Sequence, residues 1–523
     1  MFYTEKRDGF ARLGILEVEG EKIKTPTMLE KEFLKKLELE KIPYQVKNID
    51  PSAYEKLKTS GEINTLIGIS SMMPREIFEA FSAAARGKKP ILAVACATPL
   101  NASILIYLGA DLIDNLMAMA KAYSGIYFIG DVEIRVDNLE RFPCSCKFCK
   151  RQEPRNMKKE EIYETVANHN TEMLRQEVEK CRILLERENF RGYVEAKTKL
   201  KPELTALLRF SDFEENNFFP RFRKSTCYFT SQESANRFEV RYFLQRAVDC
   251  YEPKTKCLLL LPCTAKKPYL ISKTHRTIKE AVKVNVNEII ISSPLVVPRE
   301  FELMYPAVNY DTPVTGYWSD EEIEFVSKWL KKFVDKGKFE KIVAHVEGGY
   351  KRVVERALTS YDVKFTAEGD ILSKESLKKL KKELEGFDSY ELFMEMFKHA
   401  LRYQFELEFE GVVKGRYPEI ELHTKERVAR FDLKFGNLDI YGELAMELIK
   451  RGNYIVEIDD FEPSSTIFCA GIKSADEKIR PNDVVVFHNS FIYGVGIARM
   501  SGKEMVESEK GIAVEVRRKY KLN

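Results

Sequence analysis

Residues 257–275 read CLLLLPCTAKKPYLISKTH, and this stretch decides the fold of the middle of the chain. Its first five residues are apolar and end at a turn, which is typical of a buried strand in a parallel sheet. Two more apolar runs follow, NEIIISSPLVV at 287–297 and KIVAHVEG at 341–348, with an amphipathic helical pattern at 319–337 between them. Together they predict an α/β domain with a parallel sheet over residues 216–372.

A cysteine stands just after the first of these strands. Catalytic groups of open α/β sheets gather at the carboxyl ends of strands, and Lys267 and His275 are close enough in sequence to favour the thiolate of Cys263. Cys263 would then be a nucleophile. The alternative is that Cys263 is a small buried apolar residue and that Lys267, Tyr269 and His275 form a basic loop that contacts phosphate. The residues alone leave both interpretations open.

The run PCSCKFC crowds three cysteines together. They are Cys144, Cys146 and Cys149, and His169 follows on a helix predicted over about 158–187. Zinc prefers four nitrogen and sulfur ligands in a tetrahedron, so three thiolates and one imidazole would complete a closed, structural site. The alternative is a redox pair formed by the last two cysteines. We predict structural zinc.

Length and composition limit the remaining possibilities. The chain has 523 residues, with 44% hydrophobic and 32% charged, so it should form three or four packed domains. It carries 84 Lys and Arg against 81 Asp and Glu, and this balance excludes a polybasic mode of wrapping nucleic acid. The opening MFYTEKRDGF lacks the apolar core of a signal peptide, and no apolar run approaches the length that spans a bilayer. We expect a cytoplasmic protein without membrane contact.

The rest of the chain divides around this centre. In residues 1–215 short apolar runs alternate with helical patterns, which predicts an α/β domain that includes the cysteine cluster. Residues 373–446 combine two helical patterns with polar-apolar alternation, which predicts a small α+β connecting domain. Residues 447–523 carry short strands separated by turns, as in a small β barrel. The fold class is therefore multidomain α/β and α+β.

The N-terminal domain resembles the tRNA-guanine transglycosylase family. The likeness lies in FARLGILEVEGEKIKTPTML at 10–29 and in GADLIDNLMAMAKAYSGIYFIGDVEIRVDNLERFPCSCKFC at 109–149, which is similar to that family's zinc half-barrel. Asp114 falls where the family keeps the carboxylate that attacks the ribose; from its sequence context alone it would be a solvated carboxylate beside a helix. The family's second carboxylate, in an Asp-Ser-Gly segment, is missing, and the N-terminal part is short. The resemblance implies a partial, degenerate TIM barrel in which Asp114 is vestigial or lines a base pocket.

The strand-end motif resembles the pattern of archaeosine synthases, Pro-Cys-x3-Lys-Pro-Tyr-x2-Ser-x2-His. That resemblance implies an enzyme that adds an amine to the nitrile of 7-cyano-7-deazaguanine at position 15 of tRNA. Attack by Cys263 would give a thioimidate that the amine displaces. His275 would move the proton to the nitrile nitrogen, Lys267 would stabilise the thiolate or the developing charge, and Tyr269 and Ser272 would supply hydrogen bonds.

The C-terminal segment FCAGIKSADEKIRPNDVVVFHNSFIYGVGIARMSGKEMVESEKGIAVEVRRKYK resembles a PUA domain, a module shared by many RNA-modifying enzymes. Its last strand carries a basic series, which is suited to phosphate contacts, although such a series is also common on a solvated edge. The resemblance implies that these residues bind RNA; they are Arg517, Arg518, Lys519 and Lys521.

These resemblances leave partners and alternatives to be tested. One possible nitrogen donor is lysine, in which case a radical SAM enzyme would complete the reaction. The other possible donors are glutamine and ammonia. A homodimer is expected because related transglycosylases dimerise near their zinc sites. The alternative functions are a base-exchanging transglycosylase that uses Asp114 and a non-catalytic accessory subunit that binds tRNA.

Overall fold

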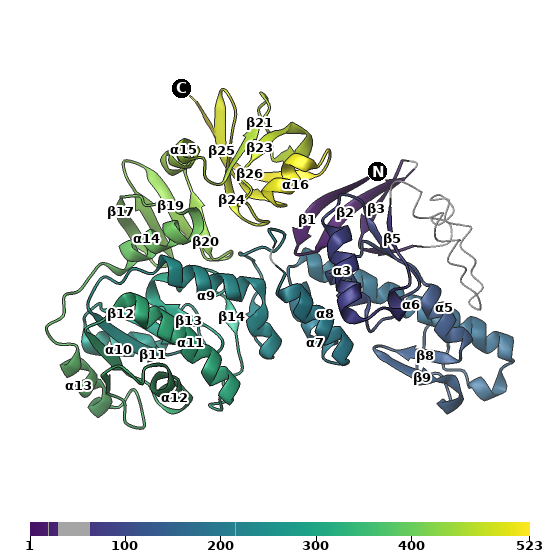
Figure 1. Cartoon of the computed structure of the whole chain (residues 1–523), viewed down its shortest axis with the longest axis horizontal. Helices are drawn as coiled ribbons and strands as arrows, with labels where there is room; N and C mark the ends of the chain where they lie inside the picture. Colours follow the sequence, from purple (N-terminus) through teal and green to yellow (C-terminus); the bar gives the residue numbers. More distant parts are fainter. Residues whose placement is uncertain (19, 30–62, 215, 523) are drawn as a thin grey trace. The chain divides into compact units, whose positions relative to one another are not determined.

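The computed structural model describes residues 1–18, 20–29, 63–214 and 216–522 (Figure 1). The chain forms two compact units, each built from more than one segment. Unit 1 comprises Met1–Phe219, Thr466–Gly471 and Arg499–Val514, and unit 2 comprises Pro220–Ser465, Ile472–Ala498 and Glu515–Asn523. Among the described residues, no helix has both the length and the apolar character needed to cross a bilayer.

Unit 1 begins with an antiparallel sheet. Its strands are β1 (Phe2–Asp8), β2 (Ala11–Val18) and β3 (Glu21–Thr25), paired in chain order. Gly9 makes the turn between β1 and β2 at a φ of +68°, where a Cβ would meet the ring of Phe219 at 2.3 Å. From β2, Arg12 donates from Nε and Nη2 to both carboxylate oxygens of Asp111 at 2.9 and 2.8 Å, a buried pair that ties this sheet to the next layer.

A parallel sheet follows in unit 1. Its order is β4 (Thr27–Met28), β7 (Leu112–Ile113), β6 (Ile91–Ala93) and β5 (Asn64–Leu66), and every neighbouring pair is parallel. Between the strands lie α3 (Pro74–Ala85) and α4 (Ala102–Tyr107), which gives the expected α/β alternation. Residues 30–62 lie outside the described residues, so the predicted partial barrel remains a prediction.

The cysteine run of unit 1 lies between a hairpin and a long helix. The hairpin is β8 (Ile126–Ile129) and β9 (Val132–Arg135), and the helix is α6 (Lys159–Glu186), close to the predicted span. The helix buries an apolar stripe at helical spacing that includes Val166, Leu174 and Leu185. The unit also contains α5 (Leu116–Tyr123), α7 (Phe190–Thr198), α8 (Pro202–Asp212) and, from its C-terminal segment, α16 (Gly502–Glu507).

Unit 2 is organised around a five-stranded sheet. The order is β13 (Val296–Pro298), β12 (Asn287–Ile291), β11 (Cys257–Pro262), β15 (Lys341–Ala344) and β16 (Val363–Phe365). Strands β12, β11, β15 and β16 are parallel, as predicted. The prediction was wrong for β13, which is antiparallel to β12, because the chain reverses in a turn closed by the Ser292 amide and the Leu295 carbonyl at 2.9 Å.

Helices cover the central strand of this sheet. Leu259 and Leu261 of β11 pack with Ile278 of α10 (Lys273–Val282) and Leu380 of α13 (Lys374–Glu383) in one buried cluster. Thus α13, placed by sequence in the third domain, contributes its apolar face to the core of the second. The helix α11 (Asp320–Gly337) packs against α9 (Phe238–Cys250), α12 (Gly348–Ala357) and β13.

Unit 2 contains further sheets, which include a short parallel pair of β10 (Cys227–Tyr228) and β14 (Tyr310–Asp311) and strands of two larger sheets. The first of these two larger sheets has β17 (Val412–Arg416), β18 (Glu419–His423), β19 (Arg427–Asp432) and β20 (Asn437–Ile440) in antiparallel chain order, with α14 (Leu392–Phe405) packed against it. After α15 (Gly442–Arg451), the second contains β25 (Ile492–Ala498), β24 (Val484–His488), β21 (Ile455–Ile458) and β23 (Ile472–Ala475) in that order. The last strand is β26 (Ile512–Lys521). The multidomain α/β class is confirmed.

Candidate functional site

The candidate active site lies at the carboxyl end of β11. Pro262 is the last residue of the strand, and the amide of Cys263 donates to the carbonyl of Ile291 at 3.0 Å, so the neighbouring strand fixes the backbone of the cysteine. The Cys263 side chain is half-buried, and its Sγ lies 3.2 Å from the hydroxyl of Tyr350. Cys263 is therefore an accessible thiol with a hydrogen-bonding partner, unlike the fully buried Cys257 that begins the same strand.

Lys267 brings a desolvated amine to this strand end. Its Nζ is buried, makes no hydrogen bond with the described residues, and lies 4.2 Å from the centre of the Tyr310 ring. Burial lowers the pKa of Lys267, although the neighbouring Cys263 opposes that shift. A buried ammonium without a hydrogen-bond acceptor is costly, so the side chain is well placed to interact with an incoming group.

Tyr269 is part of a buried hydroxyl chain. Its hydroxyl contacts that of Tyr310, and Tyr310 donates to the Oγ of Ser292 at 2.6 Å. The Tyr269 ring also stacks on the His275 ring, with centroids 5.5 Å apart. The Tyr269 side chain is fully buried beneath the loop. Its contact with Tyr310 helps to hold the Tyr310 ring beside Lys267.

His275 is held by hydrogen bonds at both ring nitrogens. Its Nε2 lies 2.9 Å from the Pro262 carbonyl, and its Nδ1 lies 2.7 Å from Nη2 of Arg299, which can only donate. Nδ1 therefore accepts and Nε2 donates. Burial, followed by the Arg299 charge, lowers the pKa of His275 to about 3, so the ring is neutral. Ser272 caps the same helix by accepting from the His275 amide at 3.2 Å.

The motif residues thus divide into two groups. Cys263 and Lys267 face the strand end, whereas Tyr269, Ser272 and His275 are buried supports of the loop. Sequence reasoning missed two further members of the site, Tyr350 and Tyr310. The signal for the first is the Gly348-Gly349-Tyr350 run directly after a buried strand, since a helix that begins there starts at the same sheet edge as the motif.

Unit 1 contains a candidate metal centre. The possible ligand atoms of Cys144, Cys146, Cys149 and His169 all lie within 4.8 Å of one another. His169 comes from α6, and the three cysteines come from the loop after β9. The four residues predicted as ligands are therefore brought together, in a cluster that could hold a metal ion.

The surroundings of His169 fit a metal ligand. Its Nε2 donates to the Phe128 carbonyl at 2.9 Å, which leaves Nδ1 facing the thiols, 3.7 Å from the Sγ of Cys146. The ring stacks on Tyr127, with centroids 4.1 Å apart and an interplanar angle of 5°. Metal-binding histidines usually donate their other ring nitrogen in this way, so the donor set and its orientation both fit zinc.

Asp114 is buried beside the parallel sheet of unit 1. Its carboxylate accepts from the Ala95 amide at 3.1 and 3.0 Å and from the Leu116 amide at 3.0 Å. Burial raises the pKa of Asp114 to about 6, while these amide bonds oppose the rise. The residue is not the solvated carboxylate that its sequence context alone suggests: it joins the ends of β6 and β7.

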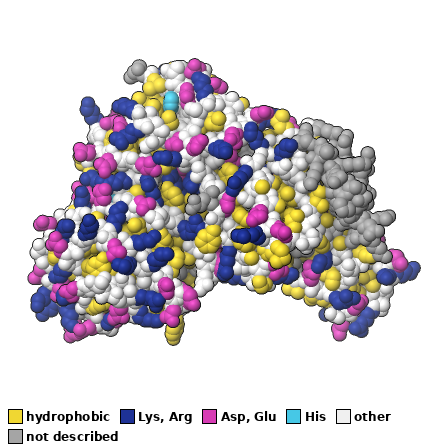
Figure 2. All heavy atoms as spheres, in the orientation of Figure 1, with side chains coloured by type: hydrophobic (Ala, Val, Ile, Leu, Met, Phe, Trp, Pro, Cys, Tyr) yellow, Lys and Arg dark blue, Asp and Glu magenta, His cyan; other side chains and the backbone are white. Residues whose placement is uncertain are grey.

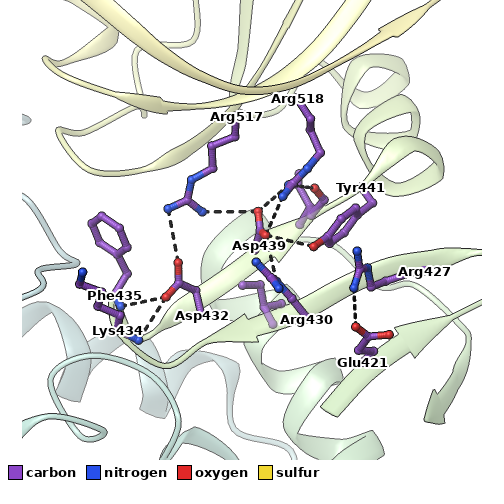
Figure 3. A network of polar contacts seen from close by, with 12 residues as sticks. Glu421, Arg427, Arg430, Asp432, Lys434, Phe435, Asp439, Tyr441, Arg517 and Arg518 are labelled. Carbon is purple, nitrogen blue, oxygen red and sulfur yellow. Dashed lines mark hydrogen bonds and ion pairs between the residues drawn. The ribbon is translucent and has the colours of Figure 1, made fainter. Parts of the chain in front are cut away.

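Two of the four basic residues at the C-terminus are engaged by carboxylates of β19 and β20 (Figure 3). Arg518 donates to both oxygens of Asp439 at 2.6 and 2.8 Å, and Arg517 contacts Asp439 at 3.4 Å and Asp432 at 3.3 Å. Arg430 also donates to Asp439, at 3.2 Å. Although burial opposes it, Arg518 and the other arginines lower the pKa of Asp439. This network fastens β26 to the antiparallel sheet of unit 2.

The other two basic residues are more available. Lys519 pairs with Glu462 at 2.7 Å on the surface, and Lys521 is exposed. Figure 2 shows Lys and Arg interspersed with Asp and Glu over the visible face, in keeping with the net charge of +3. A polyanion would therefore be recognised by local groups of cations.

Family models match four segments of the chain. They are described as Queuine tRNA-ribosyltransferase at residues 67–203, a domain of unknown function (DUF5591) at 240–384, a pre-PUA domain at 390–449 and a PUA domain at 461–520. The candidate metal centre lies within the first segment and the Cys263 site within the second.

Whole-chain relatives agree with this assignment. The archaeosine synthase subunit alpha of Methanosarcina acetivorans is 37% identical, over 82% of this chain and 74% of its own length. The archaeosine synthase of Haloferax volcanii is 34% identical, over 80% and 75%. The crystal structure of AF0587, a protein of unknown function, is 54% identical, with a TM-score of 0.50, over 54% of this chain and 100% of that one. This chain belongs to the archaeosine synthase family.

Proposed function

We propose that this protein modifies tRNA in archaeosine biosynthesis by adding an amine to the nitrile of 7-cyano-7-deazaguanine at position 15. Its family membership and its PUA and tRNA-ribosyltransferase segments support the assignment to tRNA. The observation that carries the chemistry is the Cys263 thiol, half-buried at a strand end, beside the unbonded Lys267 amine.

Covalent catalysis explains why a thiol is needed. A nitrile carbon is a weak electrophile, and attack by the Cys263 thiolate gives a thioimidate that an amine can then displace. Lys267 stabilises the thiolate and the charge that develops on the nitrile nitrogen, because its buried ammonium has no competing hydrogen bond. Tyr269, Ser272 and His275 are buried, which supports a role in positioning the loop.

The nitrogen donor is lysine, or else glutamine or ammonia. With lysine the product is an adduct that a second enzyme, of the radical SAM type, has to cleave. The name of the Methanosarcina relative includes "subunit alpha", which favours a second subunit. A homodimer with zinc at Cys144, Cys146, Cys149 and His169 completes the proposal; the zinc stabilises the fold of unit 1.

Mass spectrometry of nucleosides tests the reaction. Transfer RNA that carries 7-cyano-7-deazaguanine is incubated with the full chain and with lysine, glutamine or ammonium separately. A gain of one lysine or of one ammonia on the modified base supports the proposal and identifies the donor. Release of the base without any gain would instead favour base exchange, and tRNA binding without chemistry would favour an accessory subunit.

A pair of cysteine variants tests the covalent route. Cys263→Ala should abolish turnover and leave tRNA affinity unchanged, because only the nucleophile is lost. Cys250→Ala, a buried cysteine of α9, serves as the matched control and should keep turnover. Normal turnover in Cys263→Ala would refute the thioimidate.

A further inference from the structure

Tyr350 is the residue whose hydroxyl contacts the Cys263 thiol. It lies in the first turn of α12, directly after β15, and β15 is the parallel neighbour of β11. The carboxyl ends of parallel neighbours meet at one sheet edge. Cys263 and Tyr350 are 87 residues apart in sequence, yet the Sγ of the cysteine lies 3.2 Å from the tyrosine hydroxyl. Neither the motif nor the family resemblance drew attention to this tyrosine.

The position of Tyr350 is fixed by an indole ring. Trp318 packs against the Tyr350 ring in a T-shaped arrangement, with centroids 5.1 Å apart and an interplanar angle of 69°. Gly349 permits this contact, because a Cβ there would lie 2.2 Å from the Trp318 ring. The tyrosine hydroxyl is therefore held against the thiol by packing that does not depend on the hydroxyl itself.

The other candidate for proton transfer is occupied. Both ring nitrogens of His275 are engaged, by the Pro262 carbonyl and by Arg299, and the side chain is only 4% exposed. Arg299 is itself held by Glu288 at 2.7 Å and Glu302 at 2.8 Å, so the histidine cannot turn away without losing its hydrogen bond to a buried, fixed guanidinium. Because both nitrogens of the neutral imidazole are engaged in hydrogen bonds, neither is free to exchange a proton with the substrate.

We propose that Tyr350 is a catalytic residue that carries the proton between the Cys263 thiol and the substrate nitrogen; this inference rests on the proposed function. As Tyr350 takes the thiol proton, the sulfur attacks as the thiolate that Lys267 stabilises, and Tyr350 gives its own hydroxyl proton to the nitrile nitrogen. One carbon–nitrogen π bond becomes the nitrogen lone pair that receives the proton. When the amine displaces sulfur, the amine proton returns through the same hydroxyl to the leaving thiolate.

The test compares Tyr350→Phe with wild type in single-turnover reactions of the full chain. Loss of the hydroxyl should slow formation of the Cys263 adduct roughly 100-fold or more, the range of general acid-base catalysis. Binding of the tRNA and the melting temperature should stay unchanged, since the ring and its Trp318 contact remain. Tyr361→Phe, which removes an exposed hydroxyl bonded to Asp335, is the matched control and should keep the wild-type rate.

A second measurement covers the case in which Tyr350→Phe folds poorly. Burial and the neighbouring Cys263 raise the pKa of the Tyr350 phenol. A fluorinated tyrosine at position 350 keeps the shape and makes the phenol more acidic, so the rate of adduct formation at constant pH should change. A wild-type adduct rate in folded Tyr350→Phe, or an unchanged adduct rate with the fluorinated residue, would overturn the role of Tyr350. If Cys263→Ala remains active, the covalent function itself fails, so the two failures are distinguishable.

Discussion

Breaking the ion pair between Arg221 and Asp483 should destabilise unit 2 strongly. Arg221 donates from Nε and Nη2 to the two carboxylate oxygens at 2.8 and 3.0 Å, and the side chains are 2% and 1% exposed. The guanidinium also donates to the Tyr242 hydroxyl at 2.6 Å and to the Gln404 carbonyl at 3.3 Å. It therefore links the start of the unit to α9, α14 and the turn before β24.

The magnitude follows from burial. Asp483→Ala leaves the Arg221 charge buried without its counterion, which costs about 3–5 kcal/mol. For a unit of this size each kcal/mol lowers the melting temperature by about 2 °C, so the expected fall is about 6–10 °C. Replacing both residues together, as Arg221→Met with Asp483→Leu, should cost less than the sum of the single changes, because no unpaired charge remains.

Calorimetry and urea titration of the full chain measure these differences. Arg356→Ala is the control, because its pair with Glu324 is 51% and 70% exposed and such pairs contribute little to stability. A melting temperature of Asp483→Ala within 1 °C of wild type would refute the reasoning. The reasoning would also be refuted if the loss of unfolding free energy in the double variant equalled the sum of the losses in the two single variants. That result would mean that the two charges do not interact.

Three further predictions concern the metal, pH and RNA. Cys149→Ser should lose bound zinc in elemental analysis and lower the melting temperature of unit 1. The control Cys181→Ser, equally buried but outside the cluster, should keep one zinc per chain. Equal zinc contents in the two variants would contradict the assignment. The folded pKa of His275, about 3, lies below its unfolded value near 6.5, so its stabilisation is complete above pH 6.5 and lost as pH falls towards 3. Between pH 7 and 5 the expected loss in the free energy of unfolding is about 2 kcal/mol. In urea titrations the free energy of unfolding of His275→Gln should depend less steeply on pH than that of the wild type. The same pH dependence in both proteins would exclude His275 as its source. Lys521→Ala should reduce the salt dependence of tRNA affinity by about one unit of slope without changing stability. Arg518→Ala should instead lower the melting temperature, because the buried carboxylate of Asp439 loses its bidentate partner and keeps only Arg430 and Arg517. The opposite pattern would show that Arg518 is the phosphate contact.

Local patterns predicted the elements well. The strand at 257–261 and the helix near 158–187 could be predicted, because apolar runs and helical spacing depend only on neighbours along the chain. The Cys3His cluster was readable for a similar reason, since its residues lie on a short loop and the next helix. The reversal at β13 was missed, because a short apolar run does not show whether a turn divides it.

What the sequence by itself determined was the multidomain α/β class, the grouping of Cys144, Cys146, Cys149 and His169, and the strand-end position of Cys263. Only the tertiary structure decided the partners: Tyr350 for the thiol, Arg299 for His275, and Asp439 for Arg518. The physical reason is that these side chains meet through sheet order and packing between distant elements. A motif names the residues that carry chemical groups, but the direction in which each group points depends on what packs against it.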